Sequence, residues 1–178
     1  MILVGLSGAM GAGKSTVATL LAQRLNAHKV TVRTALLEVL GLHEPDRATL
    51  QREGASLDER TGGTWLLQHL EDLEAVGHQA IVVDSFRTRR QTLPVLTRFP
   101  RAHLIHLHAD EATRRRRYQQ AAAVDHLKAG SPFDVVSAHP VETEVEHLAQ
   151  DACLVIDTGA MTPQDVVDTI ADHFRLDA

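Results

Sequence analysis

The chain has 178 residues, 44% of them hydrophobic, and a formal net charge of −5 at pH 7. This length suits one domain with a full core rather than two, and the negative charge argues against a protein that coats nucleic acid. The single cysteine, Cys153, excludes an internal disulfide, and its apolar neighbours predict an inert buried thiol.

Short apolar runs alternate with helical spacing along the chain, which predicts an α/β fold. In chain order, we expect strands at Ile2–Leu6, Lys29–Val32, Ala80–Asp84, His103–Leu107 and Leu154–Ile156. We expect helices at Ser15–Leu25, Thr34–Leu40, Thr64–Ala75, Arg89–Arg98, Glu111–Ala123 and Pro163–Phe174. This order predicts a five-stranded parallel sheet with helices on both faces, in three layers. The stretch Gly130–His139, with a proline inside it and another after it, is the expected mobile loop.

The most specific motif is G-A-M-G-A-G-K-S, from Gly8 to Ser15, between the first predicted strand and the first predicted helix. Glycines at these positions let successive N–H groups point into one concavity, where the helix N-terminus adds partial positive charge. Lys14 is placed to reach β- and γ-phosphates, and the Ser15 hydroxyl can ligate Mg²⁺. The motif therefore predicts a nucleoside-triphosphate site, the alternative being a glycine-rich turn used only for packing.

The third predicted strand leads into V-V-D-S-F-R, which places Asp84 and Arg87 at the carboxyl edge of the sheet. Ligands of open α/β sheets bind at this edge. Asp84 could hold Mg²⁺ through water or orient the attacking oxygen, and its alternative role is an N-cap of the next helix. Arg87 could clamp the acceptor's phosphate, whereas Arg89 and Arg90 suit a solvated loop.

Two further segments could meet the acceptor. Arg33 follows the second predicted strand, at the same sheet edge, where an arginine can meet a second phosphate group. The segment Arg47–Trp65 is rich in arginine, polar residues and glycine, so it suits an acceptor site better than a core. Trp65 begins an apolar helical run, which favours core packing over base stacking.

Four consecutive arginines lie in the predicted helix Glu111–Ala123. Arg114 and Arg117 are three residues apart, so they share a helix face and could point together at a phosphate chain. Phosphoryl transfer needs such charges because negative charge spreads over the transferring oxygens. We therefore favour a lid that carries these arginines over a solvated basic helix, and both over a nucleic-acid patch.

Three histidines, His103, His106 and His108, lie close together, and only the last two fall on one face of a strand. They could bind a metal or pack at the sheet edge. Because no cysteine or carboxylate pattern surrounds them, we expect packing.

Taken in order, these motifs resemble the P-loop nucleoside monophosphate kinases, most closely the deoxynucleoside monophosphate kinases. The resemblance rests on G-A-M-G-A-G-K-S, on R-x-x-L-Q-x-x-G from Arg47 with Arg60 and Trp65, on V-V-D-S-F-R, and on D-A-C-L-V-I-D-T-G. The resemblance implies a P-loop NTPase fold over residues 1–178, with a core at 1–110 and 148–178 and a small helical lid at about 111–147. It also implies transfer of the γ-phosphoryl group of ATP, with Mg²⁺, to a nucleoside 5′-monophosphate.

By position, the resemblance assigns ATP binding to one set of residues and the acceptor to another. The ATP set is Gly8, Gly11, Ala12, Gly13, Lys14, Ser15, Thr16 and Thr158, with Ser15 and Asp84 as metal ligands. The acceptor set is Arg33, Arg52, Arg60 and Arg87, and the catalytic set is Lys14, Asp84, Arg87, Arg114 and Arg117.

The chain departs from that family in two places. It has R-R-Q at Arg89–Gln91, where such kinases commonly show Asn-Glu, and it has no arginine one turn beyond Arg117. Dephospho-CoA kinases, which carry an acidic pair after the second strand, are the nearest alternative, and V-T-V-R-T-A at Val30–Ala35 has no such pair. A kinase for a specialised phosphorylated metabolite stays possible. A regulatory nucleotide switch is disfavoured because the chain has no Asn-Lys-x-Asp motif.

These motifs imply small-molecule partners, a nucleoside triphosphate and a phosphorylated acceptor. No apolar stretch approaches ~18 residues, and no charged segment precedes the first apolar run. We therefore expect a cytoplasmic monomer or homodimer with no nucleic-acid or membrane partner.

Overall fold

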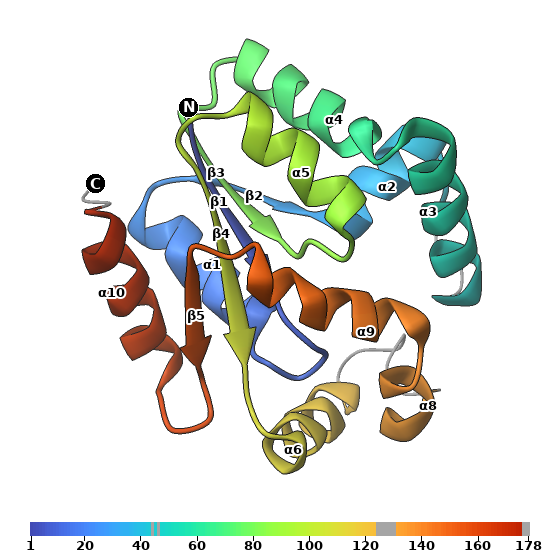
Figure 1. Cartoon of the computed structure of the whole chain (residues 1–178), viewed down its shortest axis with the longest axis vertical. Coiled ribbons are helices and arrows are strands. Elements are labelled where there is room, and N and C mark those ends of the chain that lie inside the picture. The colour runs from blue at the N-terminus through green and yellow to red at the C-terminus, as the bar shows by residue number, and fades with distance from the viewer. Residues whose placement is uncertain (44, 46, 124–130, 176–178) are drawn as a thin grey trace.

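The computed structural model describes residues 1–43, 45, 47–123 and 131–175. Its centre is a five-stranded parallel sheet in the order β2-β3-β1-β4-β5 (Figure 1). The strands are β1 (Ile2–Ser7), β2 (His28–Thr31), β3 (Ala80–Asp84), β4 (Ala102–His108) and β5 (Leu154–Asp157). Since β1 is the central strand, the glycine-rich segment that follows it leaves the sheet at the middle of its carboxyl edge.

Helices cover both faces of the sheet, as the alternating pattern predicts. They are α1 (Lys14–Arg24), α2 (Val32–Leu40), α3 (Arg47–Thr61), α4 (Thr64–Ala75), α5 (Arg89–Arg98), α6 (Glu111–Ala122), α8 (Phe133–Ser137), α9 (Pro140–His147) and α10 (Pro163–Phe174), with a 3₁₀ turn at Leu148–Gln150. Helices α1 and α10 lie on one face and α2, α4 and α5 on the other, while α6 and α8 lie beyond the end of β4 (Figure 1). The three-layer α/β P-loop NTPase fold is thus confirmed.

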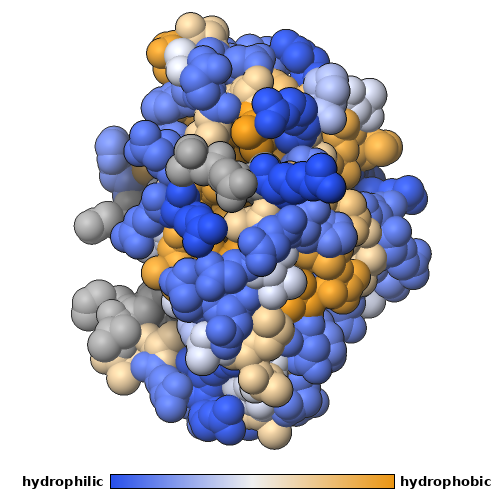
Figure 2. Space-filling view, turned by 90° about the vertical axis from the view of Figure 1, so that its left-hand side faces the viewer, coloured by the Kyte–Doolittle hydropathy of each residue, from blue (hydrophilic) through white to orange (hydrophobic). Residues whose placement is uncertain are grey.

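Two buried clusters hold the layers together, and neighbouring strand residues alternate between them. Leu3, Ile81 and Leu104 belong to the cluster under α2, α4 and α5, whereas Val4 and Ile105 belong to the cluster under α1 and α10. Both faces of each central strand are therefore buried, which explains why these strands read as continuous apolar runs. On the outward face that Figure 2 shows, hydrophilic residues predominate and hydrophobic ones show between them.

Sequence and structure differ in three helical segments. Helix α3 lies in the segment Arg47–Trp65, where no helix was predicted. It contains Gly54, at which a Cβ would lie 3.2 Å from the Leu36 side chain. The expected mobile loop Gly130–His139 contains α8 instead, because Phe133 and Val136 are buried one turn apart. Gly130 itself lies outside the described residues. Helix α9 follows directly.

Smaller differences concern single residues. The expected strand end Val32 is the first residue of α2, because Thr31 caps that helix with its side chain. Cys153 was expected to be buried, but it is exposed at the start of the edge strand β5, with Sγ 3.1 Å from the carbonyl oxygen of Leu104. An edge position gives one face of a strand to solvent, which the local apolar run does not reveal. None of the helices in the described part of the chain is both long and apolar enough to span a membrane.

Candidate functional site

A cavity of about 580 Å³ opens at the carboxyl edge of the sheet, beside the glycine-rich segment. Its walls come from the loop and first turn of α1 (residues 10–17), from Ser85 and Arg87 after β3, from α6, and from the segment after β5. A second hollow of about 490 Å³ lies at the amino edge, and no Lys, Arg, Asp or Glu is among the described residues that line it. Charge therefore singles out the first cavity as the candidate site.

The loop after β1 makes approaches that only glycine permits. Gly8 has φ +136°, and a Cβ there would lie 2.0 Å from the carbonyl oxygen of Leu107 in β4. Gly11 has φ +84°, and its Cβ would lie 2.4 Å from the carbonyl oxygen of Arg114 in α6. Both contacts are with backbone, which cannot move aside as a flexible side chain could. The motif thus fixes β1, β4 and α6 relative to the loop.

Lys14 is buried at the first turn of α1, and its Nζ donates to the carbonyl oxygens of Gly8 (2.5 Å) and Ala9 (2.8 Å). The pKa of Lys14 is lowered to about 7, chiefly by burial and then by the Arg87 charge, although the charges of Glu142 and Asp84 act to raise it. A buried cation next to another cation is stabilised by an incoming anion, so the site is built for phosphate. Ser15 and Thr16, one residue on, are exposed at the cavity.

Asp84 ends β3, opposite Leu6 of β1 and Thr31 of β2, and is buried. It does not cap the next helix, because the N-cap of α5 is Thr88. Its charge acts on Lys14, which places the carboxylate near the phosphate end of the cavity.

Carboxylate and hydroxyl oxygens suit Mg²⁺, so Asp84 and the exposed hydroxyl of Ser15 fit this ion. Among the described residues, no group of three or more His, Cys, Asp or Glu side chains could hold a metal ion. An ion bound here would therefore depend on phosphate and water oxygens for its remaining ligands.

Arg87 lines the cavity and is held at two points. Its Nη1 donates to Oε1 of Glu142 at 3.0 Å, and its backbone N–H donates to Oε1 of Gln91 at 3.1 Å. Glu142 is buried on α9, and its Oε2 accepts the backbone N–H of Met10 at 2.9 Å. Arg87 thus lies at the cavity, paired with a carboxylate that the sequence analysis did not identify, and its role as a phosphate clamp stays a prediction.

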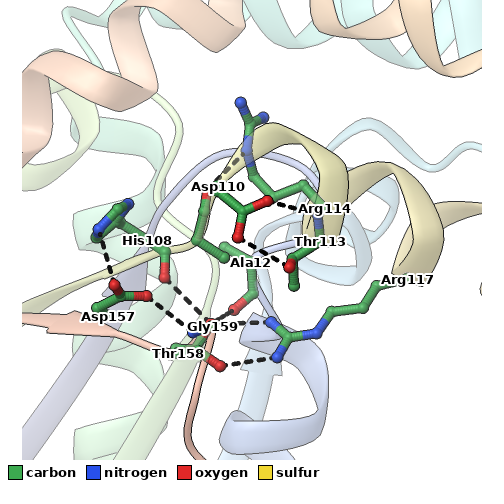
Figure 3. A network of polar contacts seen from close by, with 10 residues as sticks. Ala12, His108, Asp110, Thr113, Arg114, Arg117, Asp157, Thr158 and Gly159 are labelled. Atoms are coloured by element: carbon green, nitrogen blue, oxygen red, sulfur yellow. Dashed lines mark hydrogen bonds and ion pairs between the residues drawn. The ribbon is translucent and has the colours of Figure 1, made fainter.

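The two arginines of α6 do not point the same way, contrary to the prediction (Figure 3). Arg117 donates from Nη1 to Oγ1 of Thr158 (2.9 Å) and from Nη2 to the carbonyl oxygen of Thr158 (2.8 Å), and it lines the cavity. Arg114 turns back to its own helix start, donating from Nε to the carbonyl oxygen of Ala109 at 3.1 Å. Each side chain donates to a different backbone carbonyl, which helical spacing alone does not predict.

Thr158 joins the segment after β5 to the phosphate loop (Figure 3). Its hydroxyl lies 3.0 Å from the carbonyl oxygen of Ala12 and 3.1 Å from that of His108, and its own N–H donates to His108 at 2.8 Å. The hydroxyl can donate to only one carbonyl at a time, and it also accepts from Arg117. Thr158 therefore lies beside the loop, and its role in nucleotide binding stays a prediction.

The other predicted acceptor arginines lie away from this network. Arg33 is exposed at the start of α2, Arg52 is exposed with Nε on its neighbour Glu53, and Arg60 is exposed with Nε on the carbonyl oxygen of Ser56. Among the described residues that line the cavity, the arginines are Arg87 and Arg117. The role of Arg33, Arg52 and Arg60 in binding an acceptor stays a prediction.

Asp58 is a buried carboxylate that the sequence analysis missed. It accepts from Trp65 Nε1 (2.6 Å), from Thr88 Oγ1 (3.1 Å) and from Gln91 Nε2 (2.9 Å), and Gln91 in turn holds Arg87. The expected core packing of Trp65 is confirmed, and its indole N–H explains the carboxylate. The seven-residue spacing from Asp58 to Trp65 could have suggested that the two side chains meet. Two glycines between the helices, however, interrupt any helical periodicity that would have shown it.

The histidines serve the sheet edge, as expected. His106 is buried, with Nδ1 3.1 Å from the Ser7 hydroxyl, and burial together with the Lys14 charge lowers its pKa to about 4. His108 is exposed, 3.6 Å from Asp157. The ring of His103 packs against Phe174, with 4.2 Å between ring centroids.

Residues 4–138 match the family model described as an AAA domain, and the chain belongs to this family. No curated protein matches the chain. Among solved structures, a shikimate kinase from Acinetobacter baumannii in complex with shikimate has 15% identity to this chain and a TM-score of 0.64. The match covers 98% of this chain and 93% of the shikimate kinase chain. A gluconokinase from Sinorhizobium meliloti 1021 has 17% identity and a TM-score of 0.59, covering 98% and 91%. A sugar kinase from Janibacter sp. HTCC2649 has 15% identity and a TM-score of 0.65, covering 99% and 95%.

Each of these structures therefore has the P-loop kinase fold of this chain over nearly its whole length. At such low identity the likeness concerns the fold, and function must be argued from the site.

The lowered pKa of Lys14 predicts proton uptake when phosphates bind. With a pKa of about 7, Lys14 is mostly neutral in the free protein at pH 8, and the negative charge of a bound nucleotide restores its proton. We expect MgADP binding at pH 8 to take up about 0.9 proton, and affinity to fall about tenfold per pH unit above pH 8. Titration calorimetry in buffers of different ionisation enthalpy measures the uptake. Equal uptake in Lys14→Met would contradict this prediction.

Proposed function

We propose that this chain is an ATP-dependent phosphotransferase that uses Mg²⁺ and phosphorylates a small molecule. The first candidate acceptor is a nucleoside 5′-monophosphate, with a deoxynucleotide ahead of a ribonucleotide. One observation carries the proposal. The buried Lys14 of a complete phosphate loop lines the same cavity as Arg87 and Arg117. These three cations come from separate segments of the chain. Their shared cavity is what a triphosphate and a transferring phosphoryl group require.

The transfer step needs charge stabilisation more than covalent chemistry. A bond forms between an acceptor oxygen and the γ-phosphorus while the bond from this phosphorus to the β,γ-bridging oxygen breaks, and ADP leaves. Lys14 would neutralise the β- and γ-phosphates, and Arg87 would meet the transferring group or the acceptor. Mg²⁺, held by Ser15 and Asp84 directly or through water, would neutralise charge on the phosphate oxygens.

The donor base has a candidate place next to Thr158. Met161, Pro163 and Val166 line the cavity there, opposite Ala121 of α6. Apolar lining suits the faces of a nucleobase, and Arg117 lines the same cavity. This arrangement supports the expectation that the triphosphate is bound as a nucleotide rather than through its phosphates alone.

Two observations bear on the identity of the acceptor. Arg87 at the carboxyl edge of β3 agrees with the resemblance to nucleoside monophosphate kinases. Its ion pair with Glu142, however, offsets part of the charge that a monophosphate would meet, and favours an uncharged hydroxyl-bearing metabolite as the second candidate. Dephospho-CoA is a further candidate acceptor.

A coupled ADP-release assay over a panel of acceptors tests the function. The panel contains ribo- and deoxynucleoside monophosphates, dephospho-CoA, gluconate and shikimate, each with MgATP. We expect ADP release to depend on at least one acceptor and to fall by ~10³-fold or more in Lys14→Ala, because transition-state charge is left unpaired. A folded Lys14→Ala protein with wild-type turnover would refute the assignment of the ATP site.

Arg87→Ala separates the two substrates. We expect the KM for the acceptor to rise about tenfold or more and the KM for ATP to change less than about twofold, since a charge-assisted contact is lost from one substrate. Arg89→Ala is the matched control, because Arg89 is exposed and pairs with Asp151 on the surface. An effect of Arg87→Ala on ATP alone would move this residue to the donor site.

We also propose that residues 111–147 form a lid, of which 124–130 lie outside the described residues. Helices α6 and α8 pack through a small cluster of Met10, Tyr118, Phe133 and Val136, separate from the two main clusters. Few buried contacts make local opening inexpensive in free energy. Closure would exclude water, which competes for the γ-phosphoryl group.

Hydrogen exchange tests the lid. Amides in α6, α8 and α9 should gain at least about tenfold protection when a bisubstrate nucleotide analogue binds, because closure orders them. Amides of α10 on the opposite face of the sheet serve as the control. Equal protection of α6 and α8 with and without the analogue would show that they form a static part of the surface.

A further inference from the structure

Glu142 connects three parts of the site through one carboxylate. Its Oε2 accepts the backbone N–H of Met10 at 2.9 Å, and its Oε1 accepts Nη1 of Arg87 at 3.0 Å. The residue lies on α9, 132 positions from Met10 and 55 from Arg87 in the chain. Its side chain is 8% exposed, so the pair forms largely away from water.

The hydrogen bond to Met10 does not by itself explain why residue 142 carries a charge. Burying an ionised carboxylate is unfavourable unless it is paired and hydrogen-bonded. A neutral amide side chain of the same size could accept the Met10 N–H equally well. The charge is used by the Arg87 guanidinium, which it pairs with, and by Lys14, whose pKa it raises.

Arg87 is constrained from its other end as well. Its backbone N–H donates to Gln91, whose side chain is held by the buried Asp58. Within the described part of the chain, its guanidinium is hydrogen-bonded to a side chain through Nη1. With the backbone fixed on one side and Nη1 on the other, the remaining guanidinium N–H groups are left for a ligand in the cavity that Arg87 lines.

We infer that Glu142 is a positioning residue for phosphoryl transfer, which holds the Arg87 guanidinium in the orientation that the transferring group needs and ties it to the phosphate loop. The inference rests on the proposed function, since it assumes that phosphoryl transfer takes place in this cavity. Once α9 is in place, a guanidinium held by Glu142 loses less side-chain entropy when the transition state forms. Glu142 thereby acts through Arg87 and touches neither substrate.

The test compares binding of MgADP with binding of MgADP and aluminium fluoride, a mimic of the transferring phosphoryl group. E142Q keeps the size of the side chain and an acceptor for Met10 but removes the charge. E142D keeps the charge and shortens the side chain. E144Q is the matched control, because Glu144 is exposed on the same helix and the substitution removes the same charge.

We expect E142Q to bind MgADP within about twofold of the wild type and the aluminium fluoride complex about tenfold more weakly, with E144Q unchanged. E142D should fall between E142Q and the wild type, and it provides the comparison if E142Q fails to fold. In an R87A background, E142Q should cause no further loss, because the two residues act as one unit.

Three results would overturn the inference: wild-type binding of the fluoride complex by E142Q, fully additive losses in the double variant, or an equal loss of MgADP affinity. An equal loss of MgADP affinity would mean that Glu142 supports the phosphate loop and does not act by orienting Arg87. A wild-type chain that does not bind MgADP would remove the proposed function together with the inference. A chain that forms the fluoride complex but phosphorylates no acceptor in the panel would leave Glu142 as inferred and refute only the acceptor.

Discussion

The site depends on two cationic side chains, Lys14 and Arg87, held at one cavity at the carboxyl edge of the sheet. Lys14 and Arg87 act on each other by repulsion, which together with burial lowers the pKa of Lys14. Backbone carbonyls of Gly8 and Ala9 stabilise the ammonium, and the Glu142 carboxylate stabilises the guanidinium. A bound phosphate chain would add an anionic partner for both cations, so part of the binding free energy comes from relieving the repulsion between them.

Holding cations so close requires a backbone that approaches its neighbours more closely than side chains allow. The positions of Gly8 and Gly11 leave no room for a Cβ against β4 and α6. The carbonyl of Leu107 is near Gly8 only because β4 pairs with β1 in a fixed parallel register. The phosphate loop is therefore positioned by the sheet, and the start of α6 is positioned by the loop, which brings Arg117 to the cavity.

Much of this arrangement could be predicted from sequence because the signals are local. Residues 80–84 read as a buried strand and residues 163–174 as a capped helix, and both ranges match the structure. The phosphate loop was predictable because its chemistry demands glycine, lysine and a hydroxyl at fixed spacing. Exposure of Cys153 was not predictable, because it follows from the edge position of β5 rather than from its neighbours.

The acceptor side was the least predictable part, because buried carboxylates define it. Asp58 and Glu142 lie in polar segments that suit a solvated surface, and each is buried only because its partners come from distant positions: Gln91 is 33 residues from Asp58. Their patterns carry no periodic signal, so the sequence pointed to the arginines and missed the acids that orient them.

This pairing bears on what the pocket can accept. An arginine whose charge is shared with a buried carboxylate presents a hydrogen-bonding fork of reduced net charge. The fork can still recognise phosphate by geometry, but it discriminates less sharply between an anion and a hydroxyl than an unpaired arginine would. If Arg87 binds the acceptor as proposed, the class of acceptor depends on the balance between Arg87 and Glu142, a property of tertiary structure that motif spacing does not contain.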